Sequence, residues 1–163
     1  MPQLLESRGV RFRKNYMHLF TGLLAGILFV NTYAGWETDM EKAKVKAVQE
    51  HKLILLNFSG SDWCGPCIRL HDEVFESREF KQFAESGVIL VNADFPRMKK
   101  NQLPKEQQKQ NDFLAEKYDA NGVFPYTVLL DAQGNVVKAW EGFPQASPAQ
   151  FVGQLKNLCD ARK

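Results

Sequence analysis

The residues best suited to chemistry are two cysteines in the segment Trp63-Cys64-Gly65-Pro66-Cys67. An apolar run and a turn precede them and a helix-compatible stretch follows, so we expect Cys64 at the first turn of a helix. Free amide groups and the positive end of the helix dipole stabilise a thiolate there, which predicts a lowered pKa and greater solvent access for Cys64. Cys67 lies one turn further along, near enough to form a disulfide. The pattern predicts that Cys64 attacks a disulfide of another molecule and that Cys67 resolves the mixed disulfide.

Two other uses of this pair are open. The first is a structural staple, although a disulfide that spans two residues constrains very little chain. The second is a metal site, because Cys64, Cys67 and His71 follow one another at helical spacing and Cys159 or water could be a fourth ligand. No second closely spaced pair of Cys or His residues exists to complete such a site. The sequence therefore favours redox chemistry, with no metal and no cofactor.

Strands and helices alternate around the cysteine pair. Apolar runs predict strands over residues 53–58, 88–94, 126–130 and 136–140, the last two joined as a hairpin. Helices are expected from a Thr38 cap to about Glu50, from about Gly65 to Phe75, after a Ser77 cap, around Phe113 to Tyr118, and from Ser147-Pro148. The polar segment 95–110, with Lys99-Lys100 and two prolines, is expected to be a solvated surface loop. This order predicts an α/β fold with a mixed sheet.

The first 34 residues are typical of an export signal. Arg8, Arg11, Arg13 and Lys14 precede an apolar run from Leu19 to Val30, which is shorter than the ~20 residues of a membrane-spanning helix. Thr32-Tyr33-Ala34 has small residues where a signal peptidase needs them, so we expect cleavage after Ala34. The alternative is an uncleaved anchor from about Tyr16 to Trp36. Either reading places residues 35–163 outside the cytoplasm, in the periplasm if the cell is bacterial.

The net charge of +2 is concentrated in that leader. Without the leader the chain is close to neutral, and it shows none of the basic clustering that a nucleic-acid-binding domain needs. We therefore expect no nucleic-acid partner, and contact with a membrane only through an uncleaved leader.

Two stretches of the chain resemble thioredoxin. The first is residues 55–70, with Asn57-Phe58 before the turn and the Trp63–Cys67 motif after it. The second is Val123-Phe124-Pro125-Tyr126-Thr127 and the strand that follows. The resemblance extends from about Trp36 to Leu158, and it implies a thioredoxin-like three-layer α/β/α sandwich with a central mixed β-sheet over residues 35–163.

The resemblance also implies roles for the residues around the cysteines. Pro125 corresponds to a proline that follows a cis peptide bond beside the pair, and the Phe124 backbone to one that binds an extended substrate segment. Trp63, Gly65 and Pro66 match the rest of the active-site motif. The relatives that this chain most resembles are exported bacterial thioredoxin-like proteins.

Three positions depart from thioredoxin. The buried aspartate that helps to move the proton of the second cysteine corresponds here to Asn57, which cannot accept a proton. The lysine near that aspartate corresponds to Leu90, and residues 68–75 lack the usual proline. We therefore expect His71, four residues after Cys67, or water to take the proton. Cys159 is expected to pack as a small apolar residue, and Trp63 to contact partners.

The Gly65-Pro66 dipeptide is that of reducing thioredoxins, so the resemblance implies a thiol–disulfide oxidoreductase of the reductase type that acts on exported proteins with disulfides. Because the exterior of the cytoplasm is oxidising, such a reductase needs a membrane electron donor. A disulfide oxidase or isomerase of the same fold, and a redox-silent protein-binding module, are the alternatives.

Overall fold

The computed structural model describes residues 35–118 and 122–162. The expected leader, residues 1–34, lies outside the described residues. The elements follow in the order α1 (Met40–Glu50), β1 (Leu53–Ser59), α2 (Gly65–Leu70), a π-helical turn η1 (His71–Phe75), α3 (Arg78–Gly87), β2 (Val88–Asp94), a 3₁₀ turn η2 (Lys99–Asn101), α4 (Lys105–Tyr118), β3 (Tyr126–Leu130), β4 (Val136–Glu141) and α5 (Pro148–Asp160). Within the described ranges, no helix has the length and apolar character needed to cross a bilayer.

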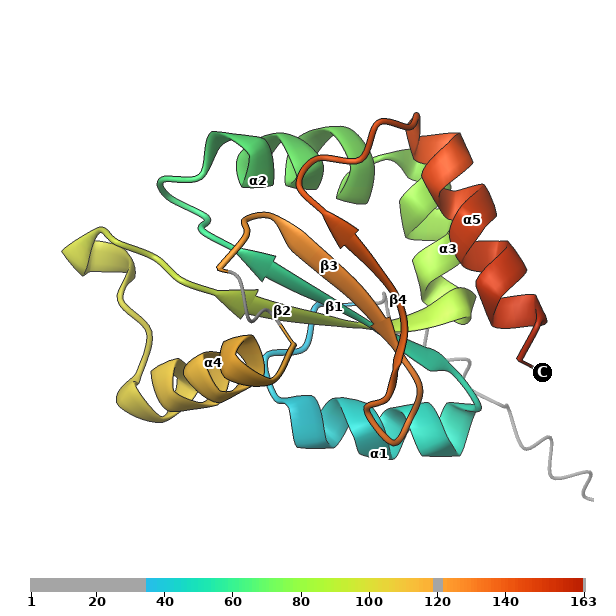
Figure 1. Ribbon diagram of the computed structural model, residues 1–163, viewed down its shortest axis with the longest axis horizontal. Helices are drawn as coiled ribbons and strands as arrows, with labels where there is room; N and C mark the ends of the chain where they lie inside the picture. The colour runs from blue at the N-terminus through green and yellow to red at the C-terminus, as the bar shows by residue number, and fades with distance from the viewer. Residues whose placement is uncertain (1–34, 119–121, 163) are drawn as a thin grey trace, which may run out of the picture. The chain divides into compact units, whose positions relative to one another are not determined.

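The four strands form one mixed sheet in the order β2-β1-β3-β4 (Figure 1). Strand β1 pairs with β2 in parallel, from Leu53 opposite Val88 to Ser59 opposite Asp94. Strand β3 pairs antiparallel with both β1 and β4. The expected mixed sheet is therefore confirmed, with β1 in its interior.

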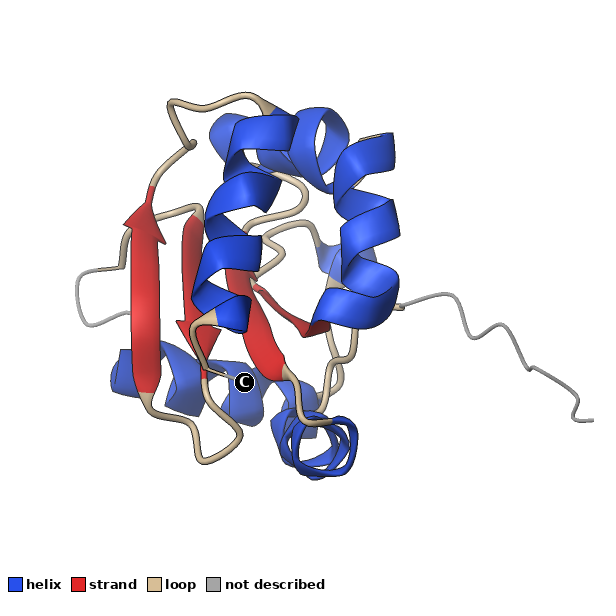
Figure 2. Cartoon of the chain, turned by 90° about the vertical axis from the view of Figure 1, so that its right-hand side faces the viewer, coloured by secondary structure: helices blue, strands red, loops and turns tan. Residues whose placement is uncertain are grey.

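Helices cover both faces of this sheet (Figures 1 and 2). Successive side chains of a strand point to opposite faces, so Ile54, Leu56 and Phe58 of β1 pack with α1 and α4, whereas Leu55 packs with α2, α3 and α5. These four side chains are fully buried, and burying each contributes roughly 1.5–3 kcal/mol. Because β1 is buried on both faces, its sequence is a continuous apolar run. The expected three-layer α/β/α architecture is confirmed.

Two of the three N-cap residues that the sequence predicts are the caps in the structure. Ser77 caps α3 through the Phe80 N–H, and Ser147 forms a reciprocal capping box with Gln150 on α5. The expected Thr38 cap of α1 is wrong by one residue, because the Asp39 carboxylate accepts the first free N–H groups of α1 instead. Aspartate ranks above threonine as a cap, so cap preference already favours Asp39 over Thr38.

The segment after β2 is shorter and more ordered than expected. Helix α4 begins at Lys105, and the residues before it include the 3₁₀ turn η2, so the predicted loop to Gln110 is too long. The first turns of α4 carry no apolar periodicity, which is why the sequence pattern missed them. Asn111 holds α4 to the sheet, since its buried side-chain amide donates to the Asp94 carbonyl (2.8 Å).

Cys159 is half-buried against the cluster on the α3 and α5 side of the sheet. Its Sγ lies 3.8 Å from the Gly87 carbonyl oxygen. Its packing agrees with the expectation of a small apolar residue.

Candidate active site

Cys64 and Cys67 form a disulfide at the start of α2. Strand β1 ends at Ser59 and a short turn leads to Cys64, whose Sγ caps α2 by accepting the Cys67 N–H (3.2 Å). Pro66 occupies the first turn of α2, and both it and Gly65 are exposed. The local order of strand, turn and helix thus directs the Cys67 N–H toward Cys64 Sγ, the first of the two sulfurs.

The expected greater solvent access of Cys64 is not found in this disulfide form. Cys64 is 5% exposed and Cys67 4% exposed, so the two are almost equally buried.

Phe124 and Pro125 lie next to the cysteine motif. The peptide bond between them is cis, as the resemblance implied. The Phe124 ring contacts the Trp63 ring edge-on, with 5.5 Å between centroids. The structure therefore brings together two motifs that lie about sixty residues apart in the printed sequence.

The turn before Cys64 is bonded to the segment after β2. The Asp62 carboxylate accepts hydrogen bonds from the N–H groups of Arg97 and Met98 and from the Asn101 side chain, each 2.9 Å long. These bonds, led by that from Arg97, hold the pKa of Asp62 below its ordinary value. Asp62 belongs to the turn expected before Cys64, and nothing in its local sequence pattern points to partners 35 residues away.

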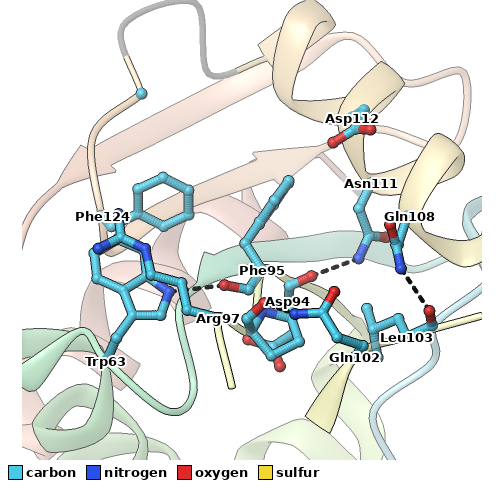
Figure 3. Close-up of a pocket in the computed structure, with 12 residues that line it drawn as sticks. Trp63, Asp94, Phe95, Arg97, Gln102, Leu103, Gln108, Asn111, Asp112 and Phe124 are labelled. Atoms are coloured by element: carbon cyan, nitrogen blue, oxygen red, sulfur yellow. Dashed lines mark hydrogen bonds between the residues drawn. The ribbon is translucent and has the colours of Figure 1, made fainter. Parts of the chain in front are cut away.

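Trp63 is held by the same segment (Figure 3). Its indole Nε1 donates to the Phe95 carbonyl (2.7 Å), and the Arg97 guanidinium lies 3.6 Å from the centroid of its ring. The segment 95–101, which we expected to be a solvated loop, is thus anchored to the active-site turn. We call residues 95–103 the wall.

A buried polar cluster lies on the other side of the cysteines. Asn57, 5% exposed, donates from Nδ2 to Asn92 Oδ1 (3.2 Å) and accepts at Oδ1 from the Thr127 hydroxyl (3.1 Å). Ser59 also bonds to Asn92 and to Asp94. Because the Asn57 amide has partners at both ends, it is fixed in orientation. Leu90, at the position of the thioredoxin lysine, is buried in the core.

This cluster opens on a cavity of about 410 Å³ that Cys67 also lines. The lining includes Asn57, Ser59 and His71. The His71 side chain is 54% exposed, and its Nδ1 lies 4.0 Å from a Glu76 carboxylate oxygen. The structure thus places the second cysteine, Asn57 and the expected proton acceptor around one space that reaches solvent.

Within residues 35–118 and 122–162, no group of three or more His, Cys, Asp or Glu side chains is placed to bind a metal. The sulfurs of Cys64 and Cys67 are bonded to each other.

The family described as thioredoxin-like domain matches residues 40–158. The chain belongs to the thioredoxin-like family. Among characterised members, a protein named disulfide bond reductase DsbH, from Chlamydia pneumoniae, is 39% identical over 127 residues, which are 78% of this chain and 74% of that protein.

Solved structures of the thioredoxin-like family agree with this assignment. A DsbH oxidoreductase superimposes with a TM-score of 0.71 at 36% identity, over 79% of this chain and 86% of the other. A thioredoxin from Thermus thermophilus superimposes with a TM-score of 0.56 at 18% identity, over 78% and 88%, and so supports the fold alone. With its Cys64–Cys67 disulfide, this member of the thioredoxin-like family is a thiol–disulfide oxidoreductase.

Proposed function

We propose that this protein is an exported disulfide reductase, which in its dithiol form transfers two electrons to a disulfide of another protein. The proposal rests on one observation: Cys64 Sγ accepts a hydrogen bond from the Cys67 N–H at the start of α2, beside the Phe124–Pro125 segment. The similarity to a relative named disulfide bond reductase favours this direction of electron flow, as does the Gly65-Pro66 dipeptide.

The reaction has two displacements. The Cys64 thiolate attacks one sulfur of the substrate disulfide, so that a mixed disulfide forms and the other substrate sulfur leaves as a thiolate. Cys67 then loses its proton and attacks Cys64 Sγ, which releases the second substrate sulfur. The substrate gains two electrons and two protons, and the protein is left with the Cys64–Cys67 disulfide.

The Cys67 proton leaves through the cavity that Cys67 lines. Asn57 lines it too but holds its hydrogen-bond partners at both ends of its amide. It therefore orients the cluster and does not accept the proton. His71 lines the same space and reaches solvent, so we assign the acceptor role to His71 or to water that it binds.

The substrate segment lies along Phe124 and Pro125. Proline has no N–H and so offers the reactive sulfur no competing donor, while the Phe124 backbone can pair with an extended chain. Trp63 contacts Phe124 and forms one edge of this groove.

The expected leader places the enzyme in the periplasm or at the outer face of the membrane. Its substrates are then exported proteins with disulfides, and a membrane electron donor returns the Cys64–Cys67 disulfide to the dithiol. No nucleic acid takes part.

Insulin reduction with dithiothreitol as the terminal donor tests the proposal. The wild-type protein should accelerate it and Cys64→Ser should not, whereas equal rates would leave only a binding module. Cys67→Ser should retain substrates as mixed disulfides on Cys64, detectable by mass spectrometry of non-reduced complexes.

The reduction potential tests the direction of electron flow. A potential near about −270 mV is expected for a reductase, whereas one near about −120 mV would identify an oxidase.

A further inference from the structure

The wall, α4, Trp63 and Phe124 line a second, open cavity of about 410 Å³ (Figure 3). Trp63, Phe95 and Phe124 form its aromatic side, and the Phe95 and Phe124 rings meet edge-on with 5.5 Å between centroids. Trp63 directly precedes Cys64 and Phe124 directly precedes Pro125. A chain bound along Phe124 therefore has this cavity within reach of the side chains that flank its reacting cysteine.

The wall is fixed before any partner arrives. Asp62 and Trp63 hold its first half, as described above. Its second half is tied by side-chain amides: Gln102 donates to the Pro96 carbonyl (2.9 Å) and Gln108 of α4 donates to the Leu103 carbonyl (2.6 Å). A preformed surface loses little conformational entropy on binding, so the wall is suited to recognition.

The outer edge of the wall is positively charged. Arg97, Lys99 and Lys100 are exposed there, and no ion pair involves any of the three within the described part of the chain. Lys44 on α1 and Lys109 on α4 pair with acids, whereas within the described ranges the exposed Lys138 and Lys156 do not. Lys99 and Lys100 thus have no acid partner among the described residues, and Arg97 stacks on the Trp63 ring.

The acids near the cavity do not cancel this charge. The Asp62 carboxylate is occupied by wall N–H groups, and the Asp94 carboxylate is occupied by Ser59 and by the N–H and hydroxyl of Ser61. Asp112 lies on α4, across the cavity from Trp63 and Arg97 (Figure 3). Of the three cations, Arg97 lines the cavity next to the active-site turn, and Lys99 and Lys100 follow it in η2.

We propose that the wall is a docking surface for an acidic segment of the substrate protein. An apolar side chain next to the reacting cysteine enters the cavity between Trp63, Phe95 and Phe124, and Asp or Glu side chains beyond it contact Arg97, Lys99 and Lys100. This proposal rests on the proposed function, and it names the substrate class as disulfides flanked by acidic sequence. Opposite charges across such an edge act mainly on the association rate and on specificity.

Single-turnover oxidation of the reduced protein by synthetic disulfide peptides tests the docking surface. Three peptides share one apolar residue beside the cysteine and differ only in flanking acidic, neutral or basic side chains. Each turnover converts one peptide disulfide to two thiols and forms the Cys64–Cys67 disulfide, so no added reductant is needed. The acidic peptide should react about tenfold faster than the basic one at low salt. This ratio of rates should fall in 0.5 M salt, because the Debye length is then only ~4 Å and the charges are screened.

Matched charge reversals identify the surface. Lys99→Glu/Lys100→Glu should abolish the preference for the acidic peptide, whereas Lys138→Glu/Lys156→Glu, the same charge change at exposed positions on β4 and α5, should keep it. Equal rates for all three peptides with the wild type, or equal effects of the two double variants, would overturn the docking surface and leave the proposed function intact. A reduced protein that reacts with none of the peptides would overturn both.

A self-association test separates a second copy of the chain from a substrate. Sedimentation should show the same oligomeric state for the wild type and for Lys99→Glu/Lys100→Glu. A wild-type dimer that dissociates in this variant would assign the wall to contacts between copies and overturn the proposal.

Discussion

Two cavities near the cysteine motif have the same volume, about 410 Å³ each, but meet the motif at different residues, one at Trp63 and the other at Cys67. The one at Trp63 is bounded by aromatic rings and an exposed cationic wall that main-chain hydrogen bonds hold in place. The one at Cys67 is lined by the hydrogen-bonded side chains of Asn57, Ser59 and Asn92, together with apolar side chains such as Trp36 and Phe75. The first cavity has exposed cations beside it, and the second has neutral polar groups next to a sulfur. Under the two proposals above, recognition of the substrate and removal of the Cys67 proton take place at different cavities.

The largest effect should come from placing a charge on the buried side. Asn57→Asp replaces the amide that donates to Asn92 Oδ1 with a carboxyl group, whose pKa burial raises. We expect a loss of unfolding free energy of roughly 2–4 kcal/mol at pH 8. Because the folded-state pKa lies above the unfolded value, the loss should be smaller at pH 5 and grow as the pH rises through the folded pKa.

Urea unfolding of the wild type and variant at pH 5 and pH 8 measures this loss. Asn157→Asp is the control, because Asn157 is exposed on α5 and such surface changes alter stability by only about 0.5 kcal/mol. Equal small losses of unfolding free energy in both variants would mean that the cluster around Asn57 tolerates a charge. The proposed difference in polarity between the two cavities would then be wrong.

The next largest effect should come from substituting His71, and it tests whether His71 accepts the Cys67 proton. In His71→Ala the resolution of the mixed disulfide should slow about tenfold at pH 7. This is less than a fully committed acid–base group contributes, because water in the cavity can still take the proton. Stopped-flow measurement of the second displacement from pH 6 to pH 8 gives the profile. His51→Asn is the matched control, since His51 has a φ of 53° that asparagine tolerates, and unchanged rates in His71→Ala would remove histidine from the mechanism.

The smallest effect should come from Asp62, which probes the exposed side. Hydrogen bonds from the wall, led by that from the Arg97 N–H, lower its pKa below the ordinary value of aspartate, so its contribution to stability is present above the unfolded-state pKa and is lost as the pH falls through the lower folded-state pKa. Asp62→Asn should therefore be less stable than the wild type at neutral pH, and the difference should vanish in acid. Amide exchange at Arg97 and Met98 should be faster in the variant at neutral pH.

Asp72→Asn, a change of an exposed acid on η1, is the control for Asp62→Asn. A difference between wild type and Asp62→Asn that does not depend on pH would show that the Asp62 carboxylate does not hold the wall.

Sequence patterns predicted the parts of the fold that depend on near neighbours. The caps Ser77 and Ser147 bond to groups three residues away, and the continuous apolar run of β1 follows from burial on both faces. The same holds for the cysteine pair, whose spacing alone brings the sulfurs within bonding distance. Where two neighbouring residues can both cap a helix, as Thr38 and Asp39 can, the expectation was wrong by one residue, although aspartate is the better cap.

Residue types by themselves determined that a disulfide would form at the start of a helix after a buried strand, because strand, turn, helix and cysteine spacing are all local properties. Tertiary structure alone decided what surrounds that disulfide. Asp62 meets the wall 35 residues away, and Asn57 meets Thr127 70 residues away, only because parallel pairing of β1 and β2 and antiparallel pairing of β1 and β3 bring those chain segments together. Such contacts have no periodicity along the chain, so their partners emerge only when the sheet has formed.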